Sequence, residues 1–204
     1  CRNKFDGKNA QQFGNIGGGI ATGQAGVPWA IQPVLSIYDE TGQLVTDAQA
    51  TVTLGIDPSS PATGGPGWLR CAGGTTVMVS GGQATFSGCA IDRVGTGYTL
   101  VATDGGLASA TSTALNIAVG PAARLAFTVQ PSGAVAARAF TPQPVVTIQD
   151  AGGNTVTAGA NSVTLAIGTN PTGGALTCTT NPLATTAGVT TFAMQPTQCR
   201  TCWT

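Results

Sequence analysis

The sequence predicts an all-β protein made of two tandem β-sandwiches, of which the second lacks its last strands. Three observations favour this fold: the composition, an internal repeat, and the alternation of apolar with polar residues inside the repeat. Among the 204 residues, Gly (30 residues), Thr and Val are abundant, whereas the helix formers Glu, Lys, Arg, Met and Leu are scarce. That balance is typical of short strands joined by tight turns, and apolar residues at 42% are enough to form cores.

An internal repeat divides the chain into two similar units. Residues 32–39 (QPVLSIYD) match residues 143–150 (QPVVTIQD), an offset of 143 − 32 = 111. The match continues through a glycine turn, and later segments of the two units agree in the same order. These further matches are 52–56 with 163–167, 69–71 with 176–178, 82–86 with 188–192, and Trp29 with Phe140. Agreement of many segments in order indicates two copies of one structural unit.

Within each unit, residue type changes with a period of two. Leu35 and Ile37 alternate with the residues around them, and Val52, Leu54 and Ile56 repeat the pattern. The corresponding residues of the second unit alternate in the same way. This period predicts strands with one buried face, and the glycines between the runs predict turns. Short strands at regular spacing with turn signals between them indicate a sandwich.

The repeated residues also carry a family resemblance. The pattern QPVxxIxD (32–39), a glycine turn, VTLxI (52–56), GxATF (82–86) and GTGYTL (95–100) resembles the bacterial immunoglobulin-like repeats of large surface and secreted proteins. The similarity extends from residue 13 to about residue 192. It implies immunoglobulin-like sandwiches of about seven strands, an extracellular or cell-surface location and structural or adhesive roles. It transfers no catalytic residues, and Tyr98, after Gly97, resembles the tyrosine corner of this fold.

The repeat sets the expected domain boundaries. We expect an N-terminal extension over residues 1–15, a first immunoglobulin-like domain over 16–119 and a second, incomplete one over 120–204. Only residues 120–123 (GPAA) separate the last expected strand of the first unit from the start of the second. A linker this short, stiffened by proline, predicts limited hinge freedom and a semi-rigid rod.

Charge and ligand content exclude several functional classes. Charged residues make up only 8% of the chain, and eight basic side chains balance eight acidic ones, so no basic patch indicates nucleic-acid binding. No apolar run approaches the roughly 18 residues of a membrane-spanning helix. Because the chain has no histidine, Ser-His and Cys-His dyads are excluded, as are the usual zinc ligand sets that need histidine. We therefore expect no enzymatic activity, no cofactor and no metal, and we interpret Asp39 and Glu40 as solvated turn residues.

The six cysteines indicate disulfides in an oxidising compartment: Cys1, Cys71, Cys89, Cys178, Cys199 and Cys202. Cys71 and Cys89 lie 89 − 71 = 18 positions apart, on either side of the expected strand 82–86, and a bridge between them would contribute roughly 3 kcal/mol. Cys178 matches Cys71, so we expect its partner shortly after residue 192, as Cys199 or Cys202. Cys1 has three interpretations: the lipid-bearing first residue of a lipoprotein, an exposed or paired cysteine at an arbitrary start, or a partner in an intermolecular bridge to Cys199 or Cys202 of a neighbour.

The second unit ends early. The first unit continues after residue 86 through 95–100 and 107–119, whereas the tail 193–204 of the second matches no strand of the repeat. Core residues and strand edges would then be exposed. Three explanations compete: a fragmentary or imperfect sequence, a strand supplied by another subunit, or a tail that wraps over the open edge. A supplied strand would come from residues 1–20, through Phe13, Ile16 and Ile20.

These features favour a non-catalytic structural subunit or stalk of an extracellular bacterial assembly or filament. Its expected partners are copies of itself or neighbouring repeats, and joining by donor-strand exchange would explain the missing strands. The first alternative is an adhesin or carbohydrate-binding module that contacts a glycan or a host surface through Trp68, which follows a loop rich in Gly and Pro. The second alternative is an accessory segment of a secreted enzyme. Trp29, which aligns with Phe140, is expected to be a core or end-cap residue.

Overall fold

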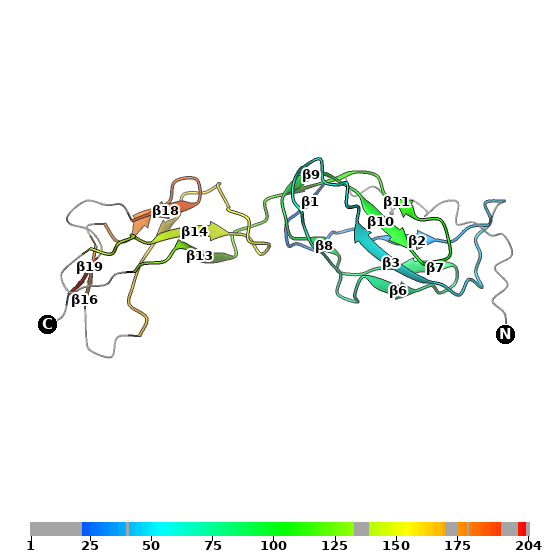
Figure 1. Cartoon of the computed structure of the whole chain (residues 1–204), viewed down its shortest axis with the longest axis horizontal. Helices are drawn as coiled ribbons and strands as arrows, with labels where there is room; N and C mark the ends of the chain where they lie inside the picture. Colours follow the sequence, from blue (N-terminus) through cyan, green and yellow to red (C-terminus); the bar gives the residue numbers. More distant parts are fainter. Residues whose placement is uncertain are drawn as a thin grey trace. The chain divides into compact units, whose positions relative to one another are not determined.

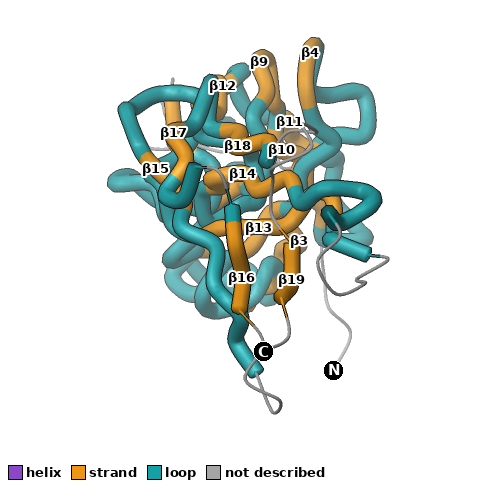
Figure 2. The backbone as a smooth tube through the Cα atoms, turned by 90° about the vertical axis from the view of Figure 1, so that its left-hand side faces the viewer, coloured by secondary structure: helices purple, strands orange, loops and turns teal. Residues whose placement is uncertain are grey.

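The computed structural model describes residues 22–39, 41–132, 139–169, 175–178 and 180–192, and the backbone of residues 200–202. These residues form strands and loops and contain no helix, as Figure 2 shows. The all-β prediction is therefore confirmed. A search of the same residues for a helix long and apolar enough to cross a membrane finds none.

The described residues fall into two compact units, which divide between Gly120 and Pro121. We call them unit 1 and unit 2 (Figure 1). The strands of unit 1 are β1 (Thr22–Gln24), β2 (Val34–Ser36), β3 (Thr51–Ile56), β4 (Thr63–Gly64), β5 (Leu69–Arg70), β6 (Thr76–Met78), β7 (Gln83–Thr85), β8 (Ala90–Ile91), β9 (Gly95–Tyr98), β10 (Leu100–Thr103), β11 (Ala110–Thr111) and β12 (Leu115–Ala118). Those of unit 2 are β13 (Arg124–Val129), β14 (Val145–Gln149), β15 (Ser162–Val163), β16 (Ala175–Thr177), β17 (Leu183–Ala184), β18 (Val189–Thr191) and β19 (Arg200–Cys202).

Unit 1 surrounds one large core with several sheets. Two four-stranded sheets have the orders β11-β10-β3-β6 and β1-β12-β9-β4, and β2 pairs with β7 and β5 with β8. All pairs are antiparallel except β1 with β12. The core combines Leu35 and Phe86 from the β2 and β7 segments with Leu54, Leu100 and Ile117 from β3, β10 and β12. This arrangement is compatible with a β-sandwich.

Unit 2 repeats part of this arrangement in the same register. β14 pairs Val146 with Thr190 of β18, as β2 pairs Leu35 with Ala84 of β7. The turns after β2 and β14 also correspond, because Asp39 and Asp150 each donate a backbone hydrogen bond to the carbonyl four residues later, at 2.9 Å. The repeat recognised in the sequence is thus a repeat of strand pairs and turns.

The tail of unit 2 corrects one expectation. We expected residues 193–204 to match no strand, but β19 pairs with β16 just as β8 pairs with β5. The physical reason is that β16 offers free backbone groups at an edge, which any extended segment can pair with. Beyond β19, the described part of unit 2 holds no counterpart of the first unit's β9, β10, β11 or β12.

Candidate functional site

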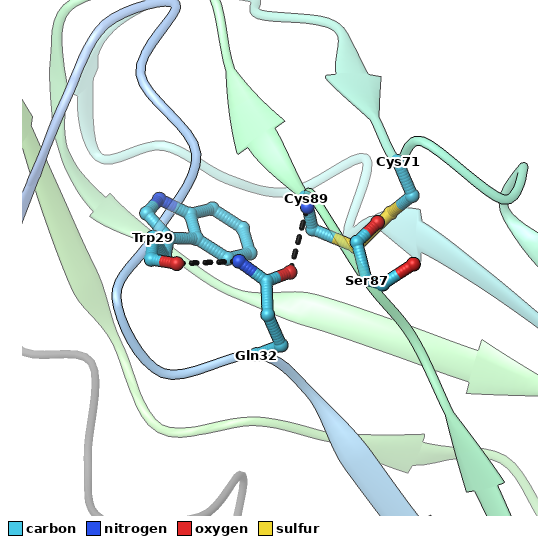
Figure 3. The surroundings of a disulfide bond; sticks show 5 residues. All are labelled: Trp29, Gln32, Cys71, Ser87 and Cys89. Atoms are coloured by element: carbon cyan, nitrogen blue, oxygen red, sulfur yellow. Dashed lines mark hydrogen bonds between the residues drawn. A yellow bond between two sulfur atoms is a disulfide. The ribbon is translucent and has the colours of Figure 1, made fainter.

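In unit 1 a disulfide joins the end of β5 to the start of β8, and a glutamine side chain links the same point to the segment before β2. Cys71 and Cys89 form the expected disulfide. They directly follow and precede the last pair of the β5–β8 ladder, Arg70 with Ala90. Beside them, the Gln32 amide nitrogen donates to the Trp29 carbonyl oxygen, and its amide oxygen accepts the backbone N–H of Cys89 at 2.6 Å (Figure 3). Cys89 is fully buried, so this pair of hydrogen bonds, which we call the glutamine clamp, satisfies backbone groups that water cannot reach.

Unit 2 has one of the two hydrogen bonds of this clamp, and we call its version the unfilled clamp. Gln143, the counterpart of Gln32, donates its amide nitrogen to the Phe140 carbonyl oxygen at 2.8 Å. Its amide oxygen is buried, and no donor among the described residues reaches it. The sequence signal for the clamp was the Gln-Pro pair before both strands; we matched this pair in the repeat without assigning it a role.

The cysteines of unit 2 follow the pattern of unit 1 as far as the described residues extend. Cys178 is disulfide-bonded. β16 pairs Ala175 with Cys202 and Thr177 with Arg200. Cys199 itself lies outside the described residues, and its pairing stays a prediction. Outside them too are Cys1 and the expected donor residues Phe13, Ile16 and Ile20.

An apolar surface on unit 2 is the main feature that sequence reasoning did not locate. Leu125 and Phe127 of β13 are 58% and 46% exposed. They stand directly opposite Ile148 and Val146 of β14, and residues opposite each other in a ladder share one face of the sheet. Ile148 and Val146 are buried, so the two exposed side chains lie on the core-forming face. We call Leu125 and Phe127 the open face of unit 2.

Trp68, the expected contact residue, lies just before β5 with its side chain 75% exposed. Its backbone is held on both sides: the Trp68 N–H donates to a carboxylate oxygen of Asp92 at 2.7 Å, and the Asp92 N–H donates to the Trp68 carbonyl at 3.3 Å. A large aromatic ring is therefore presented to solvent from an anchored backbone. Trp29, by contrast, is 5% exposed in the core of unit 1, which agrees with the expected core role.

The carboxylates of unit 1 mostly organise turns. Asp39 accepts hydrogen bonds from the backbone N–H groups of Thr41 and Gln43, whereas Glu40 lies outside the described residues. The hydroxyl of Ser59, followed by its backbone N–H, lowers the pKa of the exposed Asp57 carboxyl. Across the described ranges, no group of three or more Cys, Asp or Glu side chains is placed to hold a metal ion.

Tyr98, which the sequence resemblance likened to a tyrosine corner, lies at the end of β9. Its ring is fully buried, and its hydroxyl donates to the carbonyl oxygen of Arg93 at 3.2 Å. Burial, and then the charge of Asp92, raise the pKa of the Tyr98 phenol, while Arg93 opposes the shift. The hydroxyl serves packing and chain direction at this corner.

Comparisons of the chain with protein-family models, with curated proteins and with solved structures found no match. The resemblance to bacterial immunoglobulin-like repeats therefore stays a prediction from the sequence.

Proposed function

We propose that this protein is a non-catalytic structural subunit or stalk of an extracellular bacterial assembly. In this proposal its two units are tandem immunoglobulin-like domains, residues 16–119 and 120–204, and it associates with copies of itself or with neighbouring repeats. The repeated strand pairs, the turns they share and the buried disulfide of unit 1 support such a modular architecture.

The open face of unit 2 is the observation that carries the proposal. Two large apolar side chains, Leu125 and Phe127, are exposed on the face of the sheet that elsewhere forms the core. Burying such side chains contributes about 1.5–3 kcal/mol each, so association through this face is favoured. Clustered exposed apolar groups on a sheet are typical of contact surfaces.

The test is the oligomeric state of the full chain. We expect light scattering after size exclusion to show concentration-dependent association, which Phe127→Asp abolishes. Thr128→Asp is the matched control, because it places the same charge on the exposed polar residue that follows Phe127 in β13. A monomer at every concentration would contradict self-association.

The extracellular location rests on disulfide chemistry, because disulfides persist in oxidising compartments. Cys71 and Cys89 are bridged, and Cys178 is disulfide-bonded. Peptide mapping of the natively produced protein without reduction should recover two linked pairs, Cys71 with Cys89 and Cys178 with Cys199. Free thiols at all four positions in that material would contradict an oxidising location.

A second candidate function, glycan binding, is favoured by the geometry at Trp68. Aromatic rings that present a flat apolar surface while their backbone is fixed suit stacking on sugar rings, because little freedom is lost on binding. Arg70 lies two residues along the strand and is also exposed. Affinity electrophoresis in soluble polysaccharides should retard the wild type and not Trp68→Ala; equal mobility of both in every polysaccharide would remove this function.

A further inference from the structure

We infer that the open face of unit 2 accepts an extended β-strand segment from a separate polypeptide, with apolar side chains at every second position. The inference rests on the proposed role in assembly and adds the chemistry of the partner. Three features of the described residues carry it: the exposed side chains of β13, the segment that covers the same face in unit 1, and the incomplete interior of unit 2.

The first feature is the position of the open face in its sheet. The strand order is β13-β14-β18, so β13 is an end strand of that sheet. Leu125 and Phe127 extend the apolar surface formed by Ile148 and Val146 toward this end. A partner that packs on this face can bury both side chains, and its backbone can also pair with an edge strand.

The second feature is unit 1, which shows what covers the corresponding face. Leu35 and Ile37, the counterparts of Val146 and Ile148, are each 3% exposed and lie in the core of unit 1. Four residues from β9, β10 and β12 belong to the same core and are at most 2% exposed: Tyr98, Leu100, Leu115 and Ile117. No counterpart of these strands lies among the described residues of unit 2.

The covering strands of unit 1 define the chemistry of the partner. In β12, Leu115 and Ile117 are buried, and Asn116 between them is exposed. In β10, Leu100 and Ala102 are buried on either side of the half-buried Val101. All six residues are uncharged. The expected partner is therefore an extended segment whose inward positions are aliphatic or aromatic and whose inward side carries no charge.

The third feature is the incomplete interior of unit 2. Among the described residues, the core cluster of unit 2 contains three buried residues, Val146, Val163 and Phe192, and that of unit 1 contains 18. A polar group inside unit 2 also lacks a partner: the buried amide oxygen of Gln143 has no donor among the described residues. Adding a layer to the inner side of such a sheet buries more apolar surface than adding one to a completed sandwich does.

The test uses the covering segment of unit 1 as the probe. A synthetic peptide of residues 95–118 is titrated into the full chain by calorimetry, and amide hydrogen exchange locates the contact. We expect saturable binding with increased protection in β13 and β14. We expect Phe127→Asp to weaken binding by about tenfold or more and Thr128→Asp to change it by less than about twofold. A peptide with Leu100→Asp and Ile117→Asp should not bind.

Folding and self-association are separated from this result. Because Leu125 and Phe127 are largely exposed, their substitution opens no core, and hydrogen exchange of the β14 and β18 amides without peptide reports that unit 2 of each variant is folded. Peptide binding by a chain that stays monomeric supports the inference and removes self-assembly from the proposed function. Self-association without peptide binding or protection of β13 overturns the inference and leaves the structural role, with the open face covered by a second copy.

Discussion

Replacing Gln32 by Met should destabilise unit 1, and the same change at Gln143 should leave unit 2 nearly unaffected. Met has about the length of Gln and removes both polar atoms. In unit 1 it leaves two buried backbone groups unpaired, the N–H of Cys89, which is now 2.6 Å from the Gln32 amide oxygen, and the carbonyl of Trp29. The two units thus provide a matched pair of substitutions at one structural position.

The magnitudes follow from the number of backbone groups that each substitution leaves unpaired. A buried donor or acceptor without a partner costs about 1–3 kcal/mol, so Gln32→Met, which leaves two such groups, should lower the free energy of unfolding of unit 1 by about 2–6 kcal/mol. At Gln143 only the bond to the half-buried Phe140 is lost. That loss is offset because the substitution also removes a buried amide oxygen that has no donor among the described residues, so the net change should stay within about 1 kcal/mol.

Urea unfolding measured with two probes separates the units. Trp29 is buried beside the clamp, so in a Trp68→Phe, Trp203→Phe background its fluorescence reports the unfolding of unit 1. Hydrogen exchange of the β14 and β18 amides reports unit 2. Equal losses for Gln32→Met and Gln143→Met, or a loss below about 0.5 kcal/mol at Gln32, would refute the reasoning that the Cys89 bond makes the difference.

Two further predictions concern unit 1. Gly82→Ala should lower the free energy of unfolding by more than about 3 kcal/mol, because residue 82 has φ +80° and an added Cβ would lie 2.7 Å from the Val45 carbonyl oxygen. Gly81→Ala in the same turn is the control: an added Cβ there meets no atom within 4 Å, so the loss should be about 1 kcal/mol. Equal shifts in melting temperature for the two variants would contradict this. In a Tyr38→Phe variant, ultraviolet titration should show that Tyr98 ionises at higher pH than free tyrosine, because burial raises its pKa. Because the pKa of Tyr98 is higher in the folded than in the unfolded protein, the stability that the neutral phenol contributes is fully present below the unfolded-state pKa and is lost as the pH rises through the folded-state pKa. Ionisation of Tyr98 in the folded protein at the pH of free tyrosine would refute the burial argument.

Much of the strand framework could be predicted from the sequence because local patterns determine it. The alternation around Leu35 and Ile37 predicted a strand with one buried face, and both residues are buried next to or within β2. The Cys71–Cys89 bridge followed from their places around one strand. The sequence-based account also expected a core position for Trp29 and an accessible one for Trp68, and the burial of both side chains agrees with this.

Features that depend on distant partners could not be predicted. Leu125 and Phe127 have the apolar character of core residues, and only the set of strands packed on β13 determines whether they are covered. The clamp needs Gln32 and Cys89 to meet across 57 positions, which no local pattern encodes. The β16–β19 pair was missed because backbone pairing at a free edge requires no particular side chains.

The central proposal is that a strand from another chain covers the open face of unit 2. Cryo-electron microscopy of the concentrated full chain, with and without the peptide of residues 95–118, tests it most directly. The account predicts an added strand packed over Leu125 and Phe127 and contributed by a second molecule. Maps in which both side chains face solvent in isolated chains, with the peptide present in excess, would contradict it.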